Sequence, residues 1–130
     1  KDIDFCFVGS MTAGSSHDSR REMVHVLRNA GLNVAVASDL YDISQFNMLY
    51  NRSKIVLNHA TDVGQVFGTG YGYQCRHFEA GMTGACILSN KVVNDNAMSG
   101  FYEFTDKKTL VDLARIDRTQ CREKVVLCCF

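Results

Sequence analysis

Short apolar runs alternate with amphipathic stretches along most of the 130-residue chain. Short, continuous apolar runs are typical of strands buried on both faces of a parallel sheet. We predict four such strands, at residues 4–9, 33–37, 54–58 and 85–88. Residues 101–104 predict a fifth strand, and the apolar residues 125–130 form either a final strand or an end that meets further chain.

The segments between these runs carry apolar residues at helical spacing. They predict helices at residues 18–30, 43–51 and 107–116, and a short helix that starts near Tyr73. In the first helix, Gly31 ends the helix and the start is capped by Ser16, Asp18 or Ser19, the last in a capping box with Glu22.

Alternation of strands and helices predicts an α/β fold of the Rossmann-like type. We expect a three-layer sandwich: a mostly parallel sheet of about five strands with helices on both faces. The length predicts a single domain over residues 1–130. A strand order of 3-2-1-4-5 would place the switch point between the first and fourth strands and bring loops 10–17 and 68–73 side by side.

Composition narrows the class of partner. The net charge is zero and no basic run is present, which argues against nucleic-acid binding. No apolar run is long enough to span a bilayer, and no signal-peptide pattern is present. The six cysteines lack Cys-x-x-Cys spacing, which argues against a zinc or thioredoxin-like site, and Cys6 and Cys86 are expected to be buried in strands. We therefore expect a cytoplasmic protein with reduced thiols, in preference to a disulfide framework.

Residues 68–84 combine a glycine-rich loop with the start of the short helix. Glycines let the loop backbone adopt positive φ and approach a ligand closely. A helix that starts near Tyr73 points its free N–H groups into this loop, which predicts an anion site, most commonly for phosphate. Tyr71 and Tyr73 either stack on a base or sugar or simply cover the loop. The three glycines are Gly68, Gly70 and Gly72.

The short helix also carries a candidate ligand-binding acid. Helical spacing places Cys75, Phe78 and Met82 on its inward face, with Glu79 at the edge of that face. A carboxylate beside an apolar seam needs a partner, which is Arg76, a backbone donor or the hydroxyl groups of a ligand. Alternatively, Arg76 and Glu79 form a surface ion pair at i,i+3 that contributes about 0.2–0.5 kcal/mol.

Other motifs are absent or weaker. Gly9 and Gly14 are too far apart for the Gly-x-Gly-x-x-Gly of nicotinamide enzymes, and no Gly-Lys-Ser/Thr follows the later glycines as in a Walker loop. Among the four histidines, His17 and His59 are the better candidates for a catalytic or metal-binding role, because both are expected at the carboxyl side of the sheet.

Three stretches together resemble a known family. They are residues 5–10 with Arg20-Arg-Glu22, residues 49–58, and Arg76-His-Phe-Glu-Ala80 with Gly84-Ala-Cys-Ile-Leu88. They resemble the C-terminal half of two-domain glycosyltransferases of the GT-B fold. The resemblance is greatest to the spore-maturation CgeB-like, group 1 glycosyltransferase-like proteins, and it covers roughly residues 4–113.

The resemblance implies a nucleotide-sugar donor as substrate, with no metal and no other cofactor. The acid that matches Glu79 would accept hydrogen bonds from the ribose hydroxyls, and Arg20, Arg21 and Arg76 are candidates to neutralise the diphosphate leaving group. The acceptor-binding half is not part of this sequence, so we expect this chain alone not to run the full reaction. The implied donor-binding residues are Gly9, Ser10, Arg20, Gly70, Tyr71, Gly72, Tyr73, Arg76 and Glu79.

Two alternatives to this function stay open at this point. One is a non-catalytic α/β module that binds a nucleotide, or a partner, through the same edge. The other is a standalone domain that descends from a transferase half and has lost the ligand site. The sequence identifies neither the sugar, the base nor the acceptor, and it assigns no catalytic residue.

Overall fold

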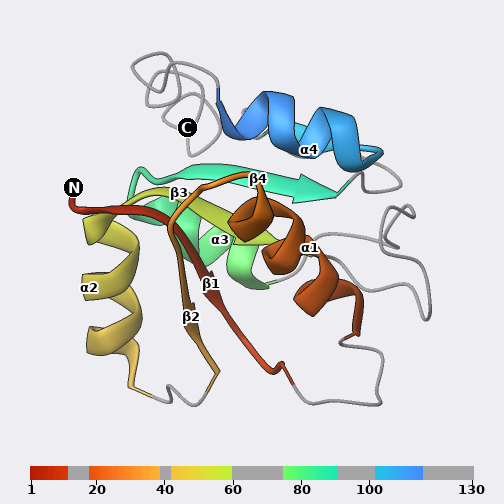
Figure 1. Cartoon of the computed structure of the whole chain (residues 1–130). Coiled ribbons are helices and arrows are strands. Elements are labelled where there is room, and N and C mark those ends of the chain that lie inside the picture. Colours follow the sequence, from red (N-terminus) through yellow and green to blue (C-terminus); the bar gives the residue numbers. More distant parts are fainter. Residues whose placement is uncertain (12–17, 39–41, 60–74, 91–101, 116–130) are drawn as a thin grey trace.

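A computed structural model describes residues 1–11, 18–38, 42–59, 75–90 and 102–115, with side chains described from residue 78 onward in the fourth range (Figure 1). Strands and helices alternate along these residues, as predicted, up to β4; the residues between β4 and β5 lie outside the described part of the chain. The strands are β1 (Ile3–Val8), β2 (Val34–Ala37), β3 (Ser53–Asn58), β4 (Cys86–Asn90) and β5 (Tyr102–Phe104). The helices are α1 (Asp18–Asn29), α2 (Ile43–Arg52), α3 (Cys75–Met82) and α4 (Lys107–Ala114). The sixth strand considered for residues 125–130 lies outside the described residues.

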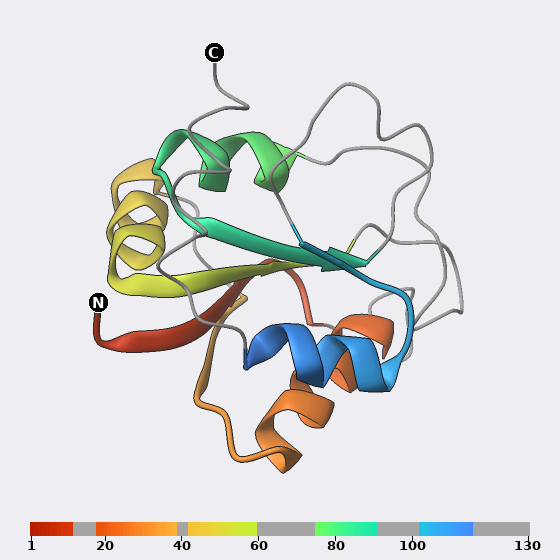
Figure 2. The same ribbon diagram turned by 90° about the horizontal axis from the view of Figure 1, so that it is seen from above.

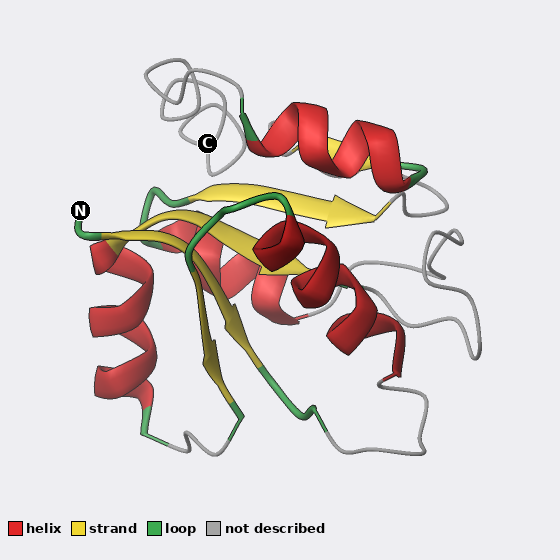
Figure 3. Cartoon of the chain, viewed as in Figure 1, coloured by secondary structure: helices red, strands yellow, loops and turns green. Residues whose placement is uncertain are grey.

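All neighbouring strands of the sheet are parallel, and their order is β2-β1-β3-β4-β5 (Figure 3). Phe7 of β1 is level with Val36 of β2 and with Leu57 of β3, and Leu57 is level with Leu88 of β4. The predicted order 3-2-1-4-5 is therefore wrong. Both orders arise from the same alternation of elements, so the hydrophobic pattern could not choose between them.

The observed order moves the switch point to the gap between β1 and β3. The segments that follow these two strands therefore leave the sheet from adjacent positions, and the second of them leads to the glycine-rich stretch. The predicted proximity of loops 10–17 and 68–73 is not tested. Residues 12–17 and 60–74 themselves lie outside the described part of the chain.

Helices cover both faces of the sheet, which confirms the three-layer sandwich (Figure 2). On one face, α1 and α4 pack through Met23, Leu27 and Leu110 against a cluster that includes Phe7 and Leu57. On the other face, α2 and α3 pack against a second cluster. That cluster contains Cys6, Val8, Tyr50, Val56, Ala80, Ala85 and Ile87, with Phe46 and Leu49 partly buried against it.

The ends of the helices follow local hydrogen-bonding rules. α1 begins at Asp18, so Ser19, one of the three predicted caps, lies buried inside the first turn instead of ahead of it. Ser16, another of the three, lies outside the described residues. Gly31 ends α1 as predicted: at φ +82° it lets the Leu32 N–H donate to the carbonyl of Leu27.

Helix α3 packs differently from the prediction. Phe78 and Met82, expected to face inward, are 51% and 83% exposed, whereas Ala80 is fully buried. Small residues let the helix lie close to the sheet, and Ala80 joins the same cluster as Ala85. The prediction failed because it assigned the largest apolar side chains to the interface. The side chain of Cys75, the third residue of the predicted face, is outside the described side chains.

The cysteines depart from the expectation in one case. Cys6 is a free, buried thiol, as predicted. Cys86 is buried too, but it is disulfide-bonded. Sequence spacing does not report a pairing between distant cysteines. Because disulfides are typical of oxidising compartments, the cytoplasmic location stays a prediction.

Candidate functional site

Buried polar side chains gather at the carboxyl edge of the sheet. β3 and β4 both end there, and α1 starts there because it follows β1 (Figure 1). In the described part of the chain, six of the seven buried polar residues lie at this edge. They are Ser19 and Arg20 at the start of α1, Asn58 and His59 at the end of β3, and Ser89 and Asn90 at the end of β4. The seventh, Ser53, lies at the opposite, amino edge.

Arg20 places a fixed positive charge beside the end of β1. Only 8% of the residue is exposed. Its Nη1 donates to the backbone carbonyl of Ser10 at 3.3 Å, and its guanidinium carbon lies 5.8 Å from the centre of the Phe7 ring. Cation–π contact and a backbone acceptor hold the guanidinium beside the carboxyl end of β1, one of the two strands that flank the switch point.

Gly9 and Ser10 form the backbone part of this site. Gly9 follows β1 with φ +150°, a conformation that side chains disfavour, and its N–H donates to the carbonyl of Ala37 at 3.0 Å. This bond continues the β1–β2 ladder by one residue, so the chain turns away from the sheet immediately after it. The Ser10 carbonyl is then in place to accept the hydrogen bond from Arg20. Gly9, Ser10 and Arg20 are all predicted donor-binding residues; the structure joins Arg20 to Ser10, and their role in donor binding stays a prediction.

The ends of β3 and β4 contribute a polar row that the sequence analysis missed. Asn58 Nδ2 donates to Ser89 Oγ at 3.1 Å, and Ser89 Oγ donates to Asn90 Oδ1 at 3.4 Å. His59, one of the two better histidine candidates, follows Asn58 and is fully buried. The sequence does contain a signal for this row. Each of the two apolar runs is followed directly by a pair of polar residues, at positions 58–59 and 89–90.

Two helices that start at the same edge are capped by aspartates. Asp42 Oδ1 accepts from the Ser44 N–H at 2.9 Å, and Asp106 Oδ1 accepts from the Thr109 N–H at 2.7 Å. These backbone hydrogen bonds, reinforced by the side chains of Ser44 and Thr109, hold the pKa of Asp42 and the pKa of Asp106 below their usual values. Both carboxylates are therefore committed to helix capping.

The remaining predicted site residues are described only in part. Glu79 lies in the middle of α3 and is exposed, rather than at the edge of a buried face. Arg76 belongs to the first turn of α3, but its side chain is outside the described side chains, so an Arg76–Glu79 pair is untested. Gly70, Tyr71, Gly72 and Tyr73 lie outside the described residues, as do Gly68 and His17.

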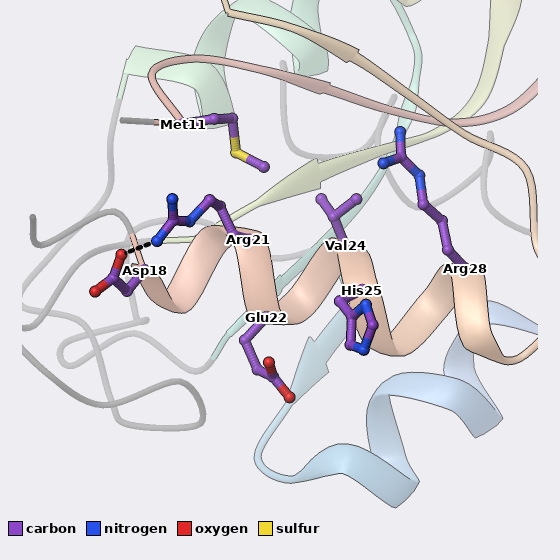
Figure 4. Close-up of a pocket in the computed structure, with 7 residues that line it drawn as sticks. All are labelled: Met11, Asp18, Arg21, Glu22, Val24, His25 and Arg28. Atoms are coloured by element: carbon purple, nitrogen blue, oxygen red, sulfur yellow. Dashed lines mark hydrogen bonds and ion pairs between the residues drawn. The ribbon is translucent and has the colours of Figure 1, made fainter. Parts of the chain in front are cut away.

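Arg21, the third candidate cation, is directed elsewhere. Its guanidinium forms an ion pair with Asp18 on the outer side of α1, where the two side chains are 39% and 59% exposed. Figure 4 shows this pair at one end of an open pocket of about 540 Å³ along α1. At the other end, Arg28 Nη2 donates to the carbonyl of Val34 on the edge strand β2. Arg20, not Arg21, is therefore the arginine that the structure places at the switch point.

A comparison with protein families agrees with this architecture. A family model described as glycosyl transferase-like matches residues 15–126, which is most of the chain. The chain belongs to the glycosyl transferase-like family. The match includes Arg20 and the polar ends of β3 and β4, whereas Gly9 and Ser10 precede it. A search of curated proteins found no match.

Two further observations concern the described residues of this glycosyl transferase-like domain. Their helices include none with the length and apolar character needed to cross a membrane. Within the same residues, no cluster of three or more His, Cys, Asp or Glu side chains could hold a metal ion.

Proposed function

We propose that this glycosyl transferase-like domain binds a nucleotide-sugar donor at the carboxyl edge of its sheet, as the donor-binding half of a GT-B enzyme. The observation that carries the proposal is the position of Arg20. A nearly buried guanidinium at the switch point, in a domain of this family, suits a diphosphate better than a neutral ligand.

The chemistry of glycosyl transfer makes such a cation useful. Transfer from a nucleotide sugar leaves a nucleoside diphosphate, so negative charge builds up on the phosphate oxygens as the glycosidic bond breaks. A cation that is already fixed by Ser10 and Phe7 needs little reorganisation when this charge develops. Gly9 and Ser10 would let the backbone approach the same phosphates.

The other donor contacts are assigned by the family resemblance. Glu79 would accept hydrogen bonds from the ribose hydroxyls, and its exposure leaves the carboxylate accessible to a ligand. The N–H groups at the start of α3, together with residues 70–73 and Arg76, would face the diphosphate. An acceptor-binding half, in a longer chain or a partner, would complete the active site; the finer likeness to CgeB-like proteins is part of the same proposal.

Calorimetric titration of the chain with UDP, GDP, ADP and their common sugar conjugates tests the proposal. We expect at least one nucleotide to bind with a dissociation constant of about 1 mM or tighter, which corresponds to about −4 kcal/mol. Glu79→Ala should weaken this binding several-fold, because it removes the acceptor for the ribose hydroxyls.

The matched control is Glu22→Ala, which removes an exposed glutamate from the outer side of α1. It should leave the affinity unchanged. Absence of binding by every nucleotide would overturn the donor-site proposal and favour a partner-binding module. Equal weakening by both substitutions would remove Glu79 from the site and point to a general electrostatic effect.

A further inference from the structure

The polar row at the ends of β3 and β4 joins two neighbouring strands through side chains. Asn58 and Ser89 are register partners in the β3–β4 ladder, so the hydrogen bond between them at 3.1 Å crosses the sheet at one level. The Ser89 hydroxyl then continues the chain to Asn90. All three residues are fully buried.

Packing does not require polar residues at these positions. Two residues earlier on the same face, Val56 and Ile87 fill the space between the sheet and its helices. Burial of amide and hydroxyl groups costs free energy unless their hydrogen bonds are made, and a buried pair adds little net stability compared with apolar residues. Polar residues here therefore serve a purpose other than stability, such as a fixed geometry.

The polar row lies close to the strand that carries the contact of Arg20. β3 is the neighbour of β1, and Asn58 lies one residue beyond Leu57, the register partner of Phe7. Phe7 is the ring under the guanidinium of Arg20. The polar row lies on β3 and β4, and the Arg20 guanidinium of α1 lies over β1, the neighbour of β3, at the same edge of the sheet. Asn58 and Ser89 share the face of Val56 and Ile87, whereas Phe7 belongs to the cluster on the opposite face, so the two features are linked through the strands and not by side-chain contact.

We infer that the Asn58–Ser89–Asn90 chain is a positioning element for the ligand site. It holds the carboxyl ends of β3 and β4 in one geometry, and with them the points from which the following segments leave the sheet. These are positioning residues rather than catalytic ones, because they act through the backbone of the strands they join. The inference rests on the proposed donor site.

Ser89→Ala tests this role, and Ser53→Ala is its matched control. Both serines are fully buried, and each hydroxyl donates one hydrogen bond: Ser53 Oγ donates to the Leu49 carbonyl at 2.7 Å at the amino edge, and Ser89 Oγ donates to Asn90 Oδ1. Ser89 Oγ also accepts from Asn58, so both substitutions should lower the urea midpoint of unfolding, Ser89→Ala somewhat more than Ser53→Ala. A third variant, Ser89→Thr, keeps the hydroxyl group and should preserve the geometry.

We expect Ser89→Ala to weaken nucleotide binding by about fivefold. The reason is that the two strand ends are no longer held in the binding geometry, and the loss is of the size of one hydrogen bond. Ser53→Ala and Ser89→Thr should each stay within about twofold of the wild-type chain. Hydrogen exchange should accelerate at the amides of residues 57–59 and 88–90 in Ser89→Ala only.

The outcomes separate this inference from the proposed function. If the wild-type chain binds a nucleotide and Ser89→Ala binds it equally well, the positioning role is wrong and the donor site stands. If the wild-type chain binds no nucleotide, the donor-site proposal is wrong, and hydrogen exchange alone tests the positioning role. Faster exchange near residues 58 and 89 in Ser89→Ala then supports the fixing of the two strand ends, and unchanged exchange overturns it. If Ser53→Ala weakens binding as much as Ser89→Ala, the effect is general destabilisation and the inference is lost.

Discussion

The two edges of the sheet use polar residues in opposite ways. At the amino edge, charged side chains form an exposed pair, Arg52 with Asp2, and a half-buried pair, Lys54 with Asp4, and buried Ser53 bonds to the end of α2. At the carboxyl edge, by contrast, six polar residues among those that the structure describes are buried, including the cation Arg20.

This difference suggests that polar residues at the amino edge serve stability, whereas those at the carboxyl edge serve ligand binding. Exposed ion pairs at the amino edge cost little and contribute little, since both partners remain in water. The buried groups at the carboxyl edge carry a desolvation cost that packing alone does not explain. A group that is costly for stability and clustered at the ligand-binding edge of an α/β sheet is most simply interpreted as functional.

The largest expected effect is a loss of stability at the amino edge. Tyr50, in the last turn of α2 next to this edge, is 1% exposed and belongs to a core cluster. Tyr50→Ala should lower the free energy of unfolding by about 3–5 kcal/mol, through lost burial and a residual cavity. Urea denaturation followed by circular dichroism measures the change. Met48→Ala on the exposed side of the same helix is the control, and an equal loss there would contradict the assignment of Tyr50 to the core.

A smaller effect is expected on nucleotide affinity when Arg20 at the carboxyl edge is compared with Arg52 at the amino edge. Arg20→Met keeps an apolar stem against Phe7 but removes the charge, so it should weaken nucleotide binding at least tenfold, or about 1.4 kcal/mol. Arg52→Met removes an exposed cation at the amino edge and should leave the affinity unchanged. Titration calorimetry of both variants decides the comparison. Similar losses in both would mean that net charge, rather than the position of Arg20, attracts the nucleotide.

The smallest effect concerns pH. The Thr109 N–H and hydroxyl keep the pKa of Asp106 below its usual value in the folded chain. A carboxyl whose folded pKa is depressed stabilises the fold above its unfolded pKa of 3.8, and this contribution is lost as the pH falls through the lower folded value. Asp106→Asn should therefore flatten the dependence of the urea midpoint on pH below about pH 4.

The amino edge offers the counterpart to that experiment. A hydrogen bond from Arg52 lowers the pKa of Asp2 to about 2, so its contribution also disappears as the pH falls toward that value. Because the pair is exposed, added salt should weaken it. Asp2→Asn should thus change how the urea midpoint of unfolding falls at acidic pH in low salt, and it should have no effect in 1 M salt. An effect that persists in high salt would contradict the interpretation of this pair as a solvent-exposed contact.

Part of the candidate site could be predicted because it depends on local sequence. Gly9 and Ser10 follow an apolar run and Arg20 lies on the next helix, so a strand–loop–helix unit is enough to bring them together. The Asn58–Ser89 contact could not be predicted in this way. It joins residues 31 positions apart and exists only because β3 and β4 are neighbours in register.

The sequence by itself determined the class of fold. Its alternation of apolar runs and amphipathic stretches specifies strands buried on both faces with helices between them, because each element must cover its apolar side. Burial within α3 was decided at the tertiary level: the close approach of Ala80 to the sheet turned Phe78 and Met82 outward. Strand order was decided there too, since any order satisfies the same pattern, and it is this order that sets Arg20 and the polar row of β3 and β4 at one edge.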